Sequence, residues 1–350
     1  MNYIIIFFLS LLLSLLMVPA VRRIAIKRCH VNKPKEDRWN NQPIALMGGI
    51  AIFISFVIAT LLIAEPTKEI IVLLLGGLVI FILGFLDDLF GTYPTIKFAV
   101  QVAVALALVN FGIVSKITPY VWLDIPLTVL WIVGLTNALN FLDNMDGLSG
   151  GVTIISALGI FGLSLINGQT VPALICIALV GSCLGFLRYN FNPAKIFMGD
   201  CGSLFLGYTL AVLAILGGWQ HSSPIASKFF SPVLILGVAI FDTTLVTILR
   251  LKNGKMPWQG GRDHCSHRLV SIFNSNEKYA VLLLYGVGIL SGGLGIIVSM
   301  LDSLASVIVT VCFFAGITIL GIKLAKVECY QDDVGLIADQ KEHSQLKIRS

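Results

Sequence analysis

Long apolar stretches without charged residues recur along almost the whole chain. A membrane-spanning helix needs about 20 mostly apolar residues, and in lipid only helices and closed barrels satisfy every backbone polar group. Barrel strands alternate between apolar and polar residues, whereas these stretches are evenly apolar. We therefore predict an all-α, polytopic membrane protein with about eleven transmembrane helices, at residues 3–21, 45–64, 70–87, 97–115, 125–142, 151–167, 171–187, 203–219, 232–250, 280–301 and 303–322.

The composition excludes water-soluble folds. Of the 350 residues, 57% are hydrophobic and 12% are charged, whereas a soluble domain carries about 25% charged residues. This chain therefore has too little charge to cover a soluble globule, which excludes a cytosolic enzyme, a disordered protein and a secreted disulfide scaffold. The net charge of +5 does not indicate a nucleic-acid partner, because in a membrane protein the distribution of the charges matters more than their sum.

Lysines and arginines lie almost entirely on one side of the predicted membrane. With the N-terminus outside, the inner segments 22–44, 88–97, 143–150, 188–202, 250–279 and 323–350 hold 21 of the 24 basic residues. The positive-inside rule then places the C-terminus in the cytoplasm. We expect one catalytic transmembrane domain at residues 1–322, followed by a short cytoplasmic tail at 323–350.

Acidic residues gather at the predicted cytoplasmic ends of the spans. Ionisable groups are costly in a membrane and usually mark function. Only Asp242 falls well inside a predicted span. Five carboxylates at one face therefore indicate a catalytic or binding centre at the cytoplasmic membrane surface, and they belong to Asp87, Asp88, Asp143, Asp146 and Asp200.

The pair Asp87-Asp88 closes the third predicted span. Adjacent carboxylates repel one another unless a cation lies nearby, and Mg²⁺ takes one or two carboxylates together with phosphate oxygens. The alternative is a solvated helix end. Lys97, which opens the next span, could reach the headgroup of a phospholipid-like substrate, or it could be a lysine that extends to the membrane interface.

A polar stripe enters the fifth predicted span. Asn137, Asn140 and Asp143 are three residues apart and share one helix face, and Asp146 continues it. Such a stripe is expensive in lipid unless it coordinates something. The alternative is hydrogen bonding between spans.

Two later segments suit phosphate groups. Asp200 lies between glycines just before a helix, where a metal-bound diphosphate could bind, unless the residue only caps that helix. His264, His267 and Arg268 form a cationic patch in the longest inner loop, and arginine recognises phosphate in a bidentate manner. The alternative is a merely basic cytoplasmic loop.

These parts together predict phosphoryl transfer, in which positioning and charge neutralisation do most of the work. Carboxylates would hold Mg²⁺, and histidine and arginine would hold phosphate. Because the centre lies at the inner membrane surface, one substrate is expected to be a lipid and the other a soluble nucleotide.

The four motifs, in this order, resemble the polyprenyl-phosphate N-acetylhexosamine-1-phosphate transferases from about Asn32 to Leu269. The resemblance implies that a UDP-N-acetylhexosamine and undecaprenyl phosphate give undecaprenyl-diphospho-sugar and UMP, with Mg²⁺ as cofactor. It also implies a multi-pass protein of the bacterial cytoplasmic membrane, acting in the first membrane step of an envelope glycan such as lipopolysaccharide or teichoic acid.

The resemblance also implies a role for each matching residue. The catalytic group would comprise Asp87, Asp88, Asp143 and His264, with the Asp pair serving the lipid phosphate. Mg²⁺ would be held by Asp200 and Asn140. Substrate binding would involve Lys97 at the lipid phosphate, Asp146 in the nucleotide-sugar motif, and His267 and Arg268 at the UDP diphosphate, with Asn137 and Asn190 alongside.

The ending His267-Arg268-Leu269 is similar to the GlcNAc-1-phosphate branch, and Ser266 stands where that branch usually has another histidine. The alternative branch is the phospho-MurNAc-pentapeptide transferases, which typically have ten spans and three consecutive histidines. Outside the family, a secondary transporter is an alternative, although its charges would lie near the midplane. Asp242 alone cannot form an intramembrane aspartyl protease. A homodimer is left open, and an apolar groove for the prenyl chain is expected beside the third, fourth and fifth spans.

Overall fold

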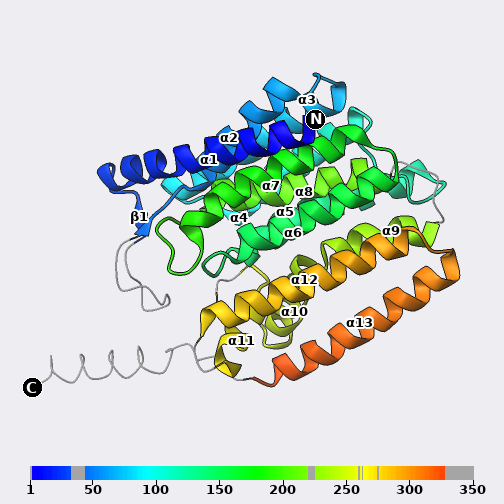
Figure 1. Ribbon diagram of the computed structural model, residues 1–350. Coiled ribbons are helices and arrows are strands. Elements are labelled where there is room, and N and C mark those ends of the chain that lie inside the picture. The colour runs from blue at the N-terminus through cyan, green and yellow to red at the C-terminus, as the bar shows by residue number, and fades with distance from the viewer. Residues whose placement is uncertain are drawn as a thin grey trace, which may run out of the picture.

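The computed structural model describes residues 2–32, 44–219, 225–258, 261, 263–273 and 276–327, and over these ranges the chain is almost entirely helical (Figure 1). A short antiparallel pair joins β1 (Val31–Asn32) to β2 (Ile44–Ala45). The α-helices within the described residues are α1 (Asn2–Lys27), α2 (Gly49–Ile63), α3 (Lys68–Phe90), α4 (Pro94–Asn110), α5 (Val121–Leu142), α6 (Leu148–Ile166), α7 (Thr170–Asn190), α8 (Asp200–Ala214), α9 (Ile225–Ile235), α10 (Gly237–Lys252), α11 (Cys265–Ile272), α12 (Glu277–Ser299) and α13 (Ser303–Ala325).

The prediction of an all-α polytopic membrane protein is confirmed. Eight helices in the described part of the chain are long and apolar enough to cross a membrane, and a bent pair would make nine. The predicted spans 45–64 and 97–115 correspond to the shorter apolar helices α2 and α4. Most of the predicted tail, residues 328–350, lies outside the described residues, and α13 continues to Ala325.

The ninth predicted span, residues 232–250, is not one straight helix. It is divided between α9 and α10, which meet at an angle of 77°. Gly237 opens α10 directly after the break, and glycine is a poor residue for continuing a helix. A run of apolar residues indicates that a segment is buried or faces lipid, but it does not indicate where the helix changes direction. Asp242 therefore lies on α10, beyond the bend, and not within one continuous spanning helix.

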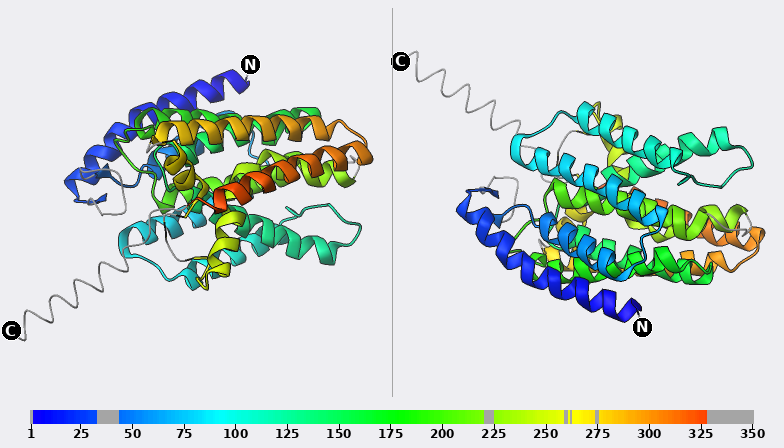
Figure 2. Two further views of the ribbon diagram at one scale, coloured as in Figure 1. Left: turned by 90° about the horizontal axis from the view of Figure 1, so that it is seen from below. Right: turned by 90° about the horizontal axis from the view of Figure 1, so that it is seen from above.

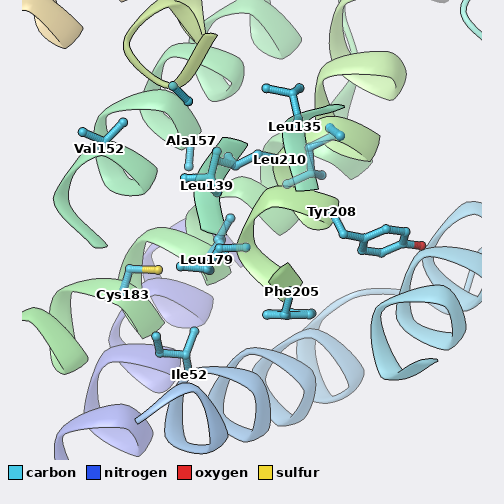
Figure 3. Packing of buried hydrophobic residues seen from close by; sticks show 14 of the residues in the cluster. Ile52, Leu135, Leu139, Val152, Ala157, Leu179, Cys183, Phe205, Tyr208 and Leu210 are labelled. Carbon is cyan, nitrogen blue, oxygen red and sulfur yellow. The ribbon is translucent and has the colours of Figure 1, made fainter. Parts of the chain in front are cut away.

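Helix α8 is the centre of the bundle. All of its spanning window, which ends in a π-helical turn (Ile215–Trp219), is buried, compared with 17% for α13. A helix that is apolar on every side is expected in such a position. Figure 3 shows Phe205, Tyr208 and Leu210 of α8 among side chains from neighbouring helices.

The peripheral helices expose apolar side chains, which suits contact with lipid. In Figure 1, α1 and α13 lie at opposite edges of the bundle. Figure 2 shows the same bundle from two further sides. The short elements β1, β2 and α11 lie at the end where α13 finishes.

Close contacts between small residues bring the end of α3 and the start of α2 against the start of α8. A Cβ atom on Gly84 would overlap with the backbone of Asp200, and one on Gly49 would overlap with the backbone of Gly202. Small residues allow helix backbones to approach in this way in membrane proteins. These contacts fix where the carboxylates of α3 and α8 meet.

We expect Gly84→Ala to lower the free energy of unfolding by about 1–3 kcal/mol, because the added methyl group forces α3 and α8 apart. The midpoint of thermal unfolding in detergent measures this. Gly286→Ala is the matched control, because it lies in α12 and a Cβ there meets nothing within 4 Å. Equal midpoints for the two variants would contradict the proposed close contact.

Candidate active site

Four helix ends bring together a cluster of charged and amide groups at one end of the bundle. The Nζ atom of Lys97 lies 2.9 Å from Oδ2 of Asp87 and 3.1 Å from Oδ2 of Asp200. On the other side of Asp200, Oδ1 accepts a hydrogen bond of 3.0 Å from Nδ2 of Asn140. The same amide nitrogen donates to Oγ of Ser203 at 2.9 Å. Residues more than a hundred positions apart therefore form one polar centre.

The turn after α3 orients Asp87 and Lys97. Gly91 ends the helix with a φ of 68°, a left-handed conformation that glycine adopts readily. The backbone nitrogen of Thr92 then donates to Oδ1 of Asp87 at 2.7 Å. Pro94 begins α4 at a position where a missing N–H costs nothing. Lys97 follows within the first turn of α4 and reaches back to Asp87.

Asp88 has a different partner from its neighbour. Its two carboxylate oxygens accept hydrogen bonds from the backbone nitrogens of Asp200, at 2.8 Å, and Cys201, at 3.0 Å. Gly199, with a φ of 78°, makes room for this carboxylate, since a Cβ there would lie 2.6 Å from Oδ2 of Asp88. The anion at the N-terminus of α8 is thus Asp88 itself, and the helix begins at Asp200 instead of near Ser203.

A cavity of about 200 Å³ opens beside this cluster. Five of its lining residues carry carboxylates, so it favours a cation or a ligand that arrives with one. Its lining includes Asp88, Asn140, Asp143, Asp146, Asn190, Asp200 and His267 among the sequence-predicted site residues, together with Leu46, Phe197 and Glu277.

Two of these residues also hold the walls of the cavity in place. Asn190 accepts from the backbone nitrogen of Gly147 at 3.0 Å and donates to the carbonyl oxygen of Ile196 at 2.9 Å. Asp146 accepts from the backbone nitrogen of Ala194 at 2.8 Å. The loop after α5 and the loop before α8 are therefore joined, which defines the shape of the cavity.

Asn137 lies deeper in α5 and has an interhelical partner. Its Nδ2 donates to Oε1 of Gln101 at 2.6 Å and to the carbonyl oxygen of Val133 at 2.8 Å. Hydrogen bonding between spans was the alternative considered for the polar stripe, and Asn137 forms such a bond. Asn137 does not line the cavity, so the stripe divides into an interhelical part and a part at the site.

The histidine loop, residues 263–269, contains a buried network of charges. His264 lies at the start of α11, and its Nδ1 is 2.8 Å from Oδ2 of Asp242. Its Nε2 is 3.4 Å from Nη2 of Arg250. Arg250 in turn forms a bidentate pair with Asp263, at 2.8 and 2.7 Å. Burial raises the pKa of Asp263, but the hydrogen bonds and the charge of Arg250 outweigh it, so that this pKa lies below its usual value.

Asp242 and Arg250 also belong to this network and were not predicted from the sequence as site residues. Asp242 was the acid inside an apolar span, which was a usable signal. Arg250 gave no separate signal among the other basic residues of the inner loop. Glu277, which lines the cavity and accepts from Nδ2 of Asn192 at 2.7 Å, was also missed. At the start of a helix it could not be distinguished from an ordinary helix-opening acid.

The guanidinium of Arg268 is engaged at the end of α13. Its Nη1 donates to the carbonyl oxygens of Leu324, at 3.2 Å, and Val327, at 2.9 Å. His267 lines the cavity, whereas His264 and Arg268 do not. Ser266, which occupies the position of a further histidine, donates to Oδ1 of Asn144 at 2.6 Å. The loop therefore presents His267 and uses its neighbours to anchor itself.

An apolar groove of about 430 Å³ runs along the other side of α5. Its second wall comes from α9 and α10, so of the third, fourth and fifth spans, beside which a groove for the prenyl chain is expected, it borders only α5. Ala138 lines the groove and Asn140 lines the cavity, so along α5 the groove ends within two residues of the cavity, on a different face of the helix. Other lining residues include Leu127, Trp131, Phe229, Ile240 and Thr244.

The chain is similar to known membrane transferases. A model for "Glycosyl transferase family 4" matches residues 70–218, which include Asp87, Lys97, Asn140 and Asp200. A "Probable undecaprenyl-phosphate N-acetylglucosaminyl 1-phosphate transferase" of Bacillus subtilis is 38% identical over 81% of both chains.

More distant relatives were also found. A "Decaprenyl-phosphate N-acetylglucosaminephosphotransferase" of Mycolicibacterium smegmatis is 32% identical, over 78% of this chain and 76% of its own. A "Phospho-N-acetylmuramoyl-pentapeptide-transferase" of Staphylococcus aureus is 28% identical, over 80% of this chain and 92% of its own.

The helical bundle and its relatives define a multi-pass membrane transferase. Within that class, the chain belongs to the polyprenyl-phosphate N-acetylhexosamine-1-phosphate transferase family, as the sequence motifs indicated.

We expect Asp88→Asn to lower the free energy of unfolding by about 1 kcal/mol, because an amide oxygen replaces only one of the two acceptors at the start of α8. Thermal unfolding in detergent measures the change. The matched control is Asp302→Asn, because Asp302 caps α13 with one hydrogen bond to Ala305, and asparagine caps as well as aspartate. Unchanged stability of Asp88→Asn would show that its carboxylate does not hold α8.

Proposed function

We propose that this protein transfers N-acetylhexosamine-1-phosphate, specifically GlcNAc-1-phosphate, from a UDP-sugar to undecaprenyl phosphate and releases UMP. The observation that carries the proposal is the cluster of Lys97, Asp87, Asp200 and Asn140 beside the acid-lined cavity. The names of the Bacillus and Mycolicibacterium relatives support it, because each includes a polyprenyl phosphate and N-acetylglucosamine. The pentapeptide transferase, at 28% identity, is less well supported than the Bacillus relative at 38%.

Lys97 and the apolar groove support a lipid phosphate as acceptor. The ammonium group would bind the terminal phosphate, while Asp87 keeps Lys97 in position at 2.9 Å. The groove on α5 would hold the beginning of the prenyl chain, because its lining is apolar and it reaches within two residues of the cavity along α5. A phosphate monoester has a second pKa near 6 and is already largely deprotonated at neutral pH. The main task of Asp87 is therefore positioning.

Asp200 and Asn140 would hold Mg²⁺. Their oxygen donors and the acid-lined cavity fit a hard cation. Lys97, placed between Asp87 and Asp200, supports the view that this position accepts positive charge. Among the described residues, no three acidic, histidine or cysteine side chains form a ready-made metal cage, which suits an ion that keeps waters and binds phosphate oxygens. When bound, Mg²⁺ would neutralise charge on the diphosphate.

The cavity would receive the nucleotide-sugar. Asp143 and Asp146 line it beside His267, which would donate a hydrogen bond to a diphosphate oxygen. Asp88 contributes indirectly by fixing the start of α8 and hence Asp200. Asn190 contributes by fixing the loop before α8.

We expect purified protein with undecaprenyl phosphate and Mg²⁺ to release UMP from UDP-GlcNAc, and not from UDP-GalNAc or UDP-MurNAc-pentapeptide. Asp200→Asn should lower the rate by about a hundredfold or more, because it removes charge at the proposed metal site. A chelator should stop the reaction and added Mg²⁺ should restore it. Release of UMP from UDP-MurNAc-pentapeptide alone would show that the protein acts as a phospho-MurNAc-pentapeptide transferase. No release from any donor would contradict the proposal.

We further propose that the protein lies in the bacterial cytoplasmic membrane, with its N-terminus outside and the site in the cytoplasm. Cys29 is exposed just after α1 and serves as a native probe. In a Cys329→Ser background, a membrane-impermeant maleimide should label Cys29 in inverted vesicles and not in intact cells. Labelling in intact cells would reverse the orientation. Cys29→Ser in the same background reports any labelling of the remaining cysteines.

A further inference from the structure

Asp242 is the buried acid at the base of the histidine loop. It lies on α10, beyond the break with α9, and its side chain is 2% exposed. One carboxylate oxygen accepts from Nδ1 of His264 at 2.8 Å, and the other accepts from the backbone nitrogen of Cys265 at 2.7 Å. A single side chain thus holds both the cap and the first residue of α11.

His264 connects Asp242 to Arg250 through its two ring nitrogens. Arginine has no acceptor, so Nε2 of His264 accepts from Arg250, and Nδ1 carries the proton that Asp242 accepts. The bond made by one ring nitrogen sets the tautomer of the other. With both nitrogens engaged and its side chain 7% exposed, His264 is placed to transmit position and not to contact a substrate.

Among the described residues of this loop, His267 is the one that lines the cavity. It follows His264 by three positions and lies on the same face of α11, with their ring centroids 6.0 Å apart. A rotation of the first turn of α11 would therefore move the His267 ring relative to the cavity.

We propose that Asp242 is a positioning residue that directs His267 at the diphosphate of the nucleotide substrate, by fixing His264 and the first turn of α11. This inference rests on the proposed function, because it assigns the diphosphate to the same cavity. Asp242 itself contacts neither substrate.

Other contacts keep α11 folded when Asp242 is changed. Ser266 is bonded to Asn144, and Arg268 is bonded to the carbonyl oxygens at the end of α13. The loss of Asp242 should therefore loosen the first turn without releasing the helix. An Asp242 variant should therefore keep α11 folded, so that a change in substrate affinity reports the position of His267 and not the loss of the helix.

The first experiment measures the affinity for UDP with Mg²⁺ by calorimetry, and kcat and KM for UDP-GlcNAc. Asp242→Asn has the same size but can accept from only one of the two donors, Nδ1 of His264 and the backbone nitrogen of Cys265, and it presents an amide N–H to the other. We expect affinity to fall about tenfold or more, with a matching rise in KM. Asp302→Asn, which changes a cap on α13, is the control and should leave both unchanged.

A double-mutant comparison tests whether the effect passes through His267. In a His267→Asn background, Asp242→Asn should have little further effect on UDP affinity, because the group it directs is already absent. If the two changes instead multiply, Asp242 acts by another route and the inference is wrong.

A second pair of variants keeps the test decisive if Asp242→Asn does not fold. His264→Asn places an amide N–H where Nδ1 was and can still donate to Asp242, whereas His264→Gln places its amide one atom further along. We expect His264→Asn to retain UDP affinity within about threefold and His264→Gln to lose about tenfold. Equal losses would overturn the inference. If the wild-type protein itself fails to bind UDP and to release UMP, the proposed function has failed, independently of Asp242.

Discussion

The close approach of α3 and α8 is the constraint on which the site depends. Glycine at position 84 lets the two backbones meet, and Asp88 then completes the start of α8 with two hydrogen bonds. This arrangement fixes Asp200 next to Asp87, and the resulting repulsion is relieved by Lys97 between them. A buried helix with an uncapped start would leave polar backbone groups without partners, which is costly in a membrane.

The rest of the site is arranged around that fixed point by elements that come from both halves of the sequence. The loop after α5 is joined to the loop before α8 through Asn190 and Asp146. The histidine loop borders the cavity through His267 and is anchored to α10, to Asn144 and to the end of α13. Three of these anchors, Asn144, Asp146 and Asn190, also line the cavity, and together with Asp242 and the end of α13 they decide which side chains face it.

Much of the fold could be predicted from the sequence, because spans and inner ends follow directly from hydrophobicity and charge. Most of the predicted site residues do meet, since helix ends on one membrane face have little room to be far apart. Their partners could not be predicted. Asp87 and Asp88 are adjacent, but successive side chains of a helix point in different directions, so one meets Lys97 and the other meets α8. Arg268 looks like a phosphate ligand in sequence, and only packing shows that α13 ends beside it.

The bend between α9 and α10 could not be predicted for a related reason. Hydrophobicity measures how a residue prefers its surroundings, and both arms of a bent helix share that preference. The acid at position 242 was the one local inconsistency in that segment, and it marks the place where the second arm meets the histidine loop.

Helix α5 has a further consequence, because it lines an apolar groove on one side and a polar cavity at its end. With the proposed substrates, a lipid would reach the groove by lateral diffusion within the membrane plane, while a nucleotide would reach the cavity from water. Separate entrances mean that neither substrate blocks the path of the other. The geometry therefore suits a ternary complex formed in either order, with a hydrophobic product that leaves sideways and a soluble one that leaves into the aqueous phase.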